Sequence, residues 1–97
     1  MTSSKSTSPK FGLGRLVATP GALAALEQSG ESPRKFVSRH VCGDWGDVDA
    51  GDWKLNDSAV TEGIRILSSY LTAKGDKIWI ITEWDRSVTT LLLPDEY

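Results

Sequence analysis

Residues 77–93 read KIWIITEWDRSVTTLLL, two apolar runs rich in β-branched and aromatic residues on either side of Asp85-Arg86. Such runs favour strands, and a two-residue connection between them predicts an antiparallel hairpin. A third run of this kind precedes them, joined by a short turn at residues 74–76. Both connections are short, so an antiparallel meander is predicted, with strands at residues 64–72, 77–84 and 87–93.

The register that this hairpin implies gives the predicted sheet two similar faces. One face carries Trp79, Ile81, Glu83, Val88, Thr90 and Leu92, and the other carries Ile78, Ile80, Thr82, Trp84, Ser87, Thr89, Leu91 and Leu93. Both faces are apolar far from the turn, whereas a sheet with one solvated face would alternate cleanly. We therefore expect helices to cover one face fully and the other partly. The remaining apolar area would suit a homodimer or a target protein, so a monomer and a homodimer both stay open.

Two helix starts in the first half of the chain share one device, a hydroxyl side chain followed by proline. Thr19-Pro20 predicts a helix over residues 20–29 that stops at Gly30, and Ser32-Pro33 predicts a second helix to about Val41. The side chains expected to be buried on these helices are Leu23, Leu26, Phe36, Val37, His40 and Val41. The only histidine thus lies on a buried face, where a hydrogen bond to the backbone is expected.

A third helix and a short first strand complete the predicted fold. Asp49 caps the helix, Asp52 supplies the acidic residue of a capping box, and the helix ends near Gly63 with Trp53 and Val60 facing inward. Residues 11–19 predict a strand whose pairing position the sequence leaves open. The fold class is therefore α+β, in the order β-α-α-α-β-β-β, with one domain over residues 11–97 and a disordered tail over residues 1–10.

The chain has 97 residues, and its composition, with 39% hydrophobic and 25% charged residues, is that of an ordinary soluble globular protein with one domain. The single Cys42 cannot form an intramolecular disulfide, which fits a reducing compartment. The first ten residues, MTSSKSTSPK, lack the apolar segment of a secretory signal, and no apolar run is long enough to span a membrane. A cytoplasmic location is expected.

Acidic residues concentrate in residues 43–62, GDWGDVDAGDWKLNDSAVTE, with six carboxylates against one lysine. This stretch is either a solvated surface or an acidic patch that meets a basic protein partner. Trp45 lies between two glycines in this loop and is predicted to be an exposed anchor. The hairpin corner is first of all a turn; if it is functional, Trp84, Asp85 and Arg86 are expected to project together at one end of the sheet. The candidate partner-binding residues are Asp44, Trp45, Asp47, Asp49, Asp52, Trp84, Asp85 and Arg86.

Two other function classes stay open. A small nuclease or toxin-like enzyme would use His40, Glu83 and Arg86 as base, acid and phosphate clamp. A nucleic-acid-binding regulator would use the basic side chains of the second predicted helix, Arg34, Lys35 and Arg39. The net negative charge of the chain argues against direct nucleic-acid binding. No residues have motif-grade catalytic spacing, and one histidine, one cysteine and scattered carboxylates predict no metal centre. No catalytic residue and no cofactor are predicted.

Three segments resemble one group of small proteins: TPGALAALEQSGESP (19–33), RHVCGDWGD (39–47) and IWIITEWDRSVTTLLLPDEY (78–97). The group is found on plasmids and integrated mobile elements and is commonly labelled "plasmid-related protein" or "type I restriction endonuclease subunit M". The chain has no Asn-Pro-Pro-Tyr or Asp-Pro-Pro-Tyr run and is too short for a methyltransferase. The resemblance therefore implies a mobile-element accessory protein. Together with the small size and the cytosolic chemistry, it favours a protein-binding inhibitor of a host nucleic-acid-targeting defence system (anti-CRISPR or antirestriction).

Overall fold

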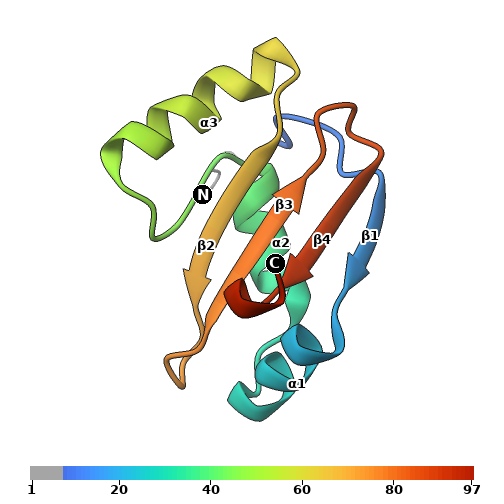
Figure 1. The fold of residues 1–97 in the computed structure, drawn as a ribbon, viewed down its shortest axis with the longest axis vertical. Coiled ribbons are helices and arrows are strands. Elements are labelled where there is room, and N and C mark those ends of the chain that lie inside the picture. Colours follow the sequence, from blue (N-terminus) through green and yellow to red (C-terminus); the bar gives the residue numbers. More distant parts are fainter. Residues whose placement is uncertain (1–7) are drawn as a thin grey trace, which may run out of the picture.

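In the computed structural model, which describes residues 8–97, four strands form one mixed sheet with the order β1-β4-β3-β2 (Figure 1). The elements are β1 (Arg15–Ala18), α1 (Pro20–Ser29), α2 (Pro33–Val41), α3 (Ala50–Glu62), β2 (Ile66–Leu71), β3 (Lys77–Thr82), β4 (Val88–Leu92) and a 3-10 turn, η1 (Pro94–Glu96). The predicted α+β class and element order are confirmed, although each strand is shorter than predicted. Most of the predicted disordered tail, residues 1–7, lies outside the described residues; within the rest, the Lys10 N–H donates to the Val41 carbonyl.

The three closing strands form the predicted antiparallel meander, and β1 joins it in parallel along the outer side of β4. The sheet as a whole is therefore mixed rather than a pure meander. The first strand, β1, has four residues, and the elements that follow it in sequence are helices, so no adjacent strand is there to pair with it. Its position therefore depends on contacts with a strand some seventy residues later, beginning with Arg15 opposite Val88.

The predicted register of the β3–β4 hairpin is confirmed, because Ile80 lies opposite Leu91 and Thr82 lies opposite Thr89. The predicted two-residue turn is wrong. The last ladder bond runs from the Glu83 N–H to the Val88 carbonyl, so the loop has residues 84–87. Inside it Arg86 adopts a left-handed φ of 60° and its N–H donates to the Glu83 carbonyl.

The predicted helix caps are present. Thr19 Oγ1, Ser32 Oγ and Asp49 Oδ1 each accept a main-chain N–H from the first turn of their helix. One predicted core position is wrong: Leu23 is 49% exposed, and α1 instead buries Ala22, Ala25 and Leu26. The small alanines let α1 lie close to the sheet, and its leucine at position 23 faces away.

Two apolar clusters form the core. Helices α1 and α2 pack on one face of the sheet, while α3 lies beside β2 and η1 lies on the opposite face (Figure 1). The larger cluster lies under α1 and α2, where Leu26 and Phe36 meet Ile78, Ile80 and Leu91. The smaller one lies under α3 and is formed by Trp45, Ala59 and Ile66, with Phe11, Val48, Trp53 and Val60 around them. None of the helices in the described part of the chain is long and apolar enough to cross a bilayer.

Candidate functional site

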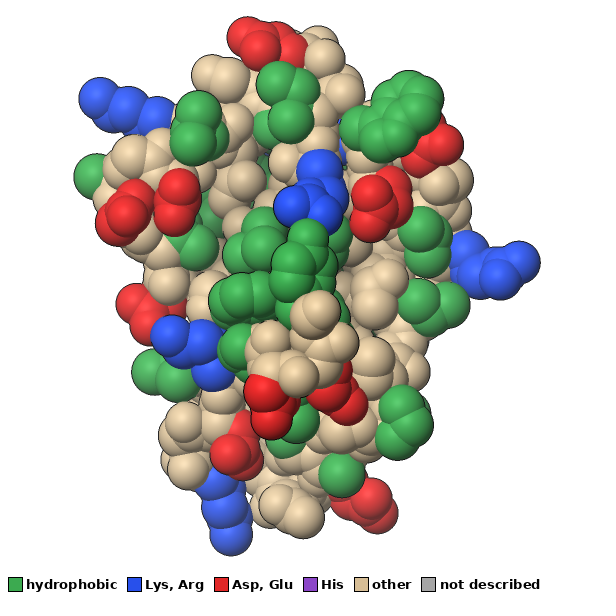
Figure 2. All heavy atoms as spheres, in the orientation of Figure 1, with side chains coloured by type: hydrophobic (Ala, Val, Ile, Leu, Met, Phe, Trp, Pro, Cys, Tyr) green, Lys and Arg blue, Asp and Glu red, His purple; other side chains and the backbone are tan. Residues whose placement is uncertain are grey.

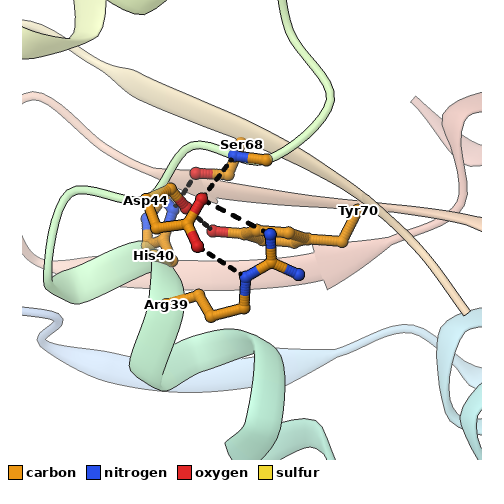
Figure 3. A network of polar contacts seen from close by, with 6 residues as sticks. Arg39, His40, Asp44, Ser68 and Tyr70 are labelled. Carbon is orange, nitrogen blue, oxygen red and sulfur yellow. Dashed lines mark hydrogen bonds and ion pairs between the residues drawn. The ribbon is translucent and has the colours of Figure 1, made fainter.

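The acidic loop between α2 and α3 divides its carboxylates between structural and exposed positions. Asp44 is structural, since its Oδ2 atom lies 2.8 Å from Arg39 Nε. The Arg39 guanidinium in turn lies over the Tyr70 ring, and the Tyr70 hydroxyl donates to the Asp44 carbonyl oxygen at 2.6 Å (Figure 3). The hydrogen bonds from Arg39 hold the pKa of Asp44 below its ordinary value. By contrast, Asp47 and Asp52 are exposed, and Asp49 is exposed although its Oδ1 also caps α3.

Trp45 is fully buried, so its predicted exposure is wrong. Gly46, with a φ of 78°, turns the chain so that it pairs with the outer edge of β2. The Ser69 N–H donates to the Trp45 carbonyl at 3.1 Å. The indole ring then packs against Phe11, and its N–H donates to Asp57 at 2.9 Å. A side chain held in this way anchors the loop to the domain and is not available to a partner.

The hairpin tip does not present its three predicted residues together. Trp84 is 65% exposed and Asp85 is exposed, but Arg86 turns underneath the loop. Its guanidinium donates to the carbonyl oxygens of Ala59 at 2.7 Å, Ile64 at 2.7 Å and Glu83 at 3.1 Å. Carbonyl groups at the end of a helix lack partners within the helix, and a cation there is favoured. Arg86 therefore ties the end of α3 to the hairpin.

His40 belongs to a buried chain of hydrogen bonds under the sheet. Its Nδ1 lies 2.6 Å from Ser68 Oγ, and its Nε2 lies 2.9 Å from Thr82 Oγ1. Thr82 contacts Thr89 at 2.7 Å, and the Thr89 hydroxyl donates to the Leu13 carbonyl at 2.7 Å. The predicted buried position of His40 is confirmed, but its predicted backbone partner is wrong, because both ring nitrogens meet side-chain hydroxyls.

The last hydrogen bond of this series, from Thr89 to the Leu13 carbonyl, determines the tautomer of His40. Since the single proton of the Thr89 hydroxyl goes to a carbonyl, Thr89 must accept from Thr82, and Thr82 must accept from His40 Nε2. Nδ1 is then an acceptor from Ser68. Burial, with a smaller contribution from the nearby positive charge of Arg86, lowers the pKa of His40 to about 3. The imidazole is therefore neutral and closed to solvent, and it does not join Glu83 and Arg86 in an accessible acid–base site.

A groove between α3 and β2 was not foreseen from the sequence. It has a volume of about 330 Å³, and its lining residues are Val48, Asp52, Leu55, Asn56, Ser58, Glu62, Ile64, Arg65 and Leu67. Leu55 is 68% exposed and Ile64 is 51% exposed. One signal for it is present in the sequence: Leu55 is a large apolar residue outside the stripe of Trp53, Asn56 and Val60 that α3 turns inward.

The face of the sheet opposite α1 and α2 carries further apolar surface next to this groove. Figure 2 shows apolar side chains gathered in the middle of this face, over the strands and the C-terminal turn. The Tyr97 ring packs edge-on against Trp79, with 5.8 Å between the ring centroids, and the Tyr97 hydroxyl accepts a hydrogen bond from Arg65. Arg65 also lines the groove, so the two apolar areas adjoin.

A second hollow, of about 590 Å³, lies over the end of α2, lined by Pro9, Ser38, Arg39, Val41, Cys42 and Asp44. Its two charged side chains, Arg39 and Asp44, are paired with each other. Across residues 8–97, no three His, Cys, Asp or Glu side chains gather closely enough to hold a metal ion. Comparison with known protein families, with curated proteins and with solved structures finds no match.

Proposed function

We propose that this chain is a non-catalytic mobile-element protein that acts in the cytoplasm by binding another protein. Its target is a basic, nucleic-acid-binding surface of a host defence complex, such as a CRISPR or restriction nuclease. The observation that carries this proposal is the cluster of exposed carboxylates at Asp47, Asp49 and Asp52. Among the described residues the ion pairs are Lys35–Glu31 and Arg39–Asp44, so no ion pair neutralises these three.

An uncompensated group of carboxylates attracts a surface rich in lysine and arginine. Such complementarity accelerates encounter and selects the partner, although it contributes less to affinity than buried contacts do. The exposed Leu55 and Ile64, which line the same groove as Asp52, can supply buried contacts of that kind. The resemblance to proteins of plasmids and integrated elements supports the setting, because elements of this kind meet nucleases that attack foreign DNA.

The two alternatives receive less support. An enzyme using His40 as a base would need a ring nitrogen that substrate can reach, yet the side chain is buried and both nitrogens are bonded. A nucleic-acid-binding regulator would need basic side chains on α2 that are free to meet phosphate groups. Lys35 Nζ lies 2.6 Å from Glu31 Oε2, and Arg39 is paired with Asp44, so two of the three basic side chains are engaged.

The proposal is tested by phage plating on bacteria that carry one CRISPR or restriction system at a time. The chain, its Asp47→Lys/Asp52→Lys variant and a charge-matched Glu27→Lys/Asp76→Lys control are expressed in turn; all four positions are exposed. We expect phage to plate on bacteria with at least one of these systems when the wild type or the control is expressed. With the Asp47→Lys/Asp52→Lys variant we expect the phage to stay blocked. The proposed function is wrong if the wild type protects phage from none of the systems.

A further inference from the structure

The α3–β2 groove, defined by the lining residues given above, has an apolar floor and charged rims. Val48, Leu55, Ile64 and Leu67 supply apolar surface. A cavity of roughly 150 Å³ holds a benzene molecule. The groove volume of about 330 Å³ therefore has room for about two large side chains.

The edge of β2 beside this groove is closed to strand addition. Asn56 Nδ2 donates to the Leu67 carbonyl at 2.8 Å, and Asn56 Oδ1 accepts the Leu67 N–H at 3.3 Å. At Ser69 the N–H donates to the Trp45 carbonyl, and the carbonyl accepts the Asp47 N–H. A peptide strand binds a sheet edge through free main-chain groups, and these are already used. A partner must therefore enter this groove with side chains.

The dimensions and charges of the groove match a short helix. The 13 residues of α3 span about 20 Å at 1.5 Å per residue, so a partner helix of three to four turns would lie along it. Asp52 and Glu62 stand near the two ends of α3 and line the groove, about 15 Å apart along the helix axis. Lys54 is the only basic residue of α3, and the groove lining sets the carboxylates of Asp52 and Glu62 against the single guanidinium of Arg65. The α3 rim therefore favours cationic side chains.

We propose that the α3–β2 groove binds an amphipathic α-helix of the target protein. An apolar stripe of that helix enters between Leu55 and Leu67, and its Lys or Arg side chains lie over Asp52 and Glu62. Apolar residues at positions i, i+3 or i+4, and i+7 form such a stripe on one side of a helix. This inference rests on the proposed function and names the element of the target that the acidic surface meets.

Two synthetic 14-residue peptides serve as probes, both stapled as helices with leucine at positions i, i+3 and i+7. One carries lysine on both flanks of the stripe, and the other carries glutamate at the same positions. Each is titrated into the ¹⁵N-labelled chain, and amide resonances are followed. We expect the lysine peptide to shift resonances of the groove residues and the glutamate peptide to bind more weakly or not at all.

Two variants locate the binding. Leu55→Ser should weaken the lysine peptide about tenfold or more, as expected from losing one buried aliphatic contact. Leu23→Ser is the matched control, because Leu23 is an exposed leucine on α1, 49% exposed against 68% for Leu55. Asp52→Lys/Glu62→Lys should reverse the preference between the two peptides.

The inference is overturned if neither peptide binds, if both bind equally, if the shifts lie outside the groove, or if Leu55→Ser behaves like Leu23→Ser. These results are separable from a failure of the proposed function. If peptide binding fails while the Asp47/Asp52 variant still abolishes phage protection, the groove inference falls and the proposed function stands. If the lysine peptide binds as expected but the wild type never protects phage, the proposed function falls and the helix site stands.

Discussion

Acidification from pH 7 to pH 5 should destabilise this protein through one side chain, His40. In the native state burial holds the pKa of His40 at about 3, with a smaller contribution from the charge of Arg86. An unfolded histidine titrates near pH 6.5. Between these two values the unfolded chain takes up a proton that the native protein does not bind. Stability is therefore complete above pH 6.5 and is lost as the pH falls toward 3.

The size of the effect follows from the difference between the two pKa values. Each pH unit between them lowers the free energy of unfolding by about 1.4 kcal/mol, which amounts to about 2 kcal/mol from pH 7 to pH 5 and about 4 kcal/mol down to pH 3. Carboxylates do not contribute much in the upper part of this range, because they titrate near pH 4 in the unfolded chain. The pKa of Asp44, lowered by hydrogen bonds from Arg39, affects stability only at lower pH.

Urea denaturation followed by tryptophan fluorescence measures this loss at pH 7, 6 and 5. The control is His40→Gln, because glutamine offers Thr82 a donor and Ser68 an acceptor but does not titrate. Its free energy of unfolding should be nearly constant over this range. In the wild type, NMR of the single histidine reports the pKa directly, and ¹⁵N shifts should show Nε2 protonated and Nδ1 bare.

Equal pH dependence in the wild type and His40→Gln would refute this reasoning, as would a His40 resonance that titrates near pH 6.5. Either result would mean that solvent reaches the imidazole, so that the series of hydrogen bonds from Ser68 to Leu13 is not sealed from water. The NMR measurement still decides the matter if the glutamine variant does not fold. A Nδ1-protonated tautomer would contradict the order of donors inferred from Thr89.

Three further outcomes are expected. Arg86→Ala should lower the free energy of unfolding by about 2–3 kcal/mol in urea denaturation at neutral pH, because a charged donor to two carbonyls at the end of α3 and one in the hairpin is lost. No change would contradict its role in joining the two. Gly46→Ala should be far more destabilising than Gly63→Ala in thermal unfolding. Both glycines have positive φ, but only at Gly46 would a Cβ clash with main-chain atoms of β2. Tyr97→Ala should shift tryptophan emission to the red, because Trp79 becomes more exposed to solvent. The free energy of unfolding should fall by about 1 kcal/mol or less, since Tyr97 is 65% exposed. Unchanged emission would contradict the contact between Tyr97 and Trp79.

The elements that the sequence predicts well depend on neighbours within a few residues. A hydroxyl at Thr19 or Ser32 meets an N–H two or three positions later, and Gly30 takes its left-handed conformation at the end of its own helix. The hairpin register likewise follows from a short connection and the alternation of its two strands. Such features are encoded locally, so composition and spacing are enough to identify them.

The site depends on contacts between distant parts of the chain, and those contacts decide which candidate residues are free. Trp45 is buried because Gly46 pairs with Ser69, and Arg86 is engaged because the hairpin tip meets the end of α3. The groove exists because Asn56 joins α3 to the edge of β2. Local patterns therefore predict the helices, the meander and the exposed acids, whereas packing over long sequence separations decides the position of β1, the partners of His40 and the surface left open for binding.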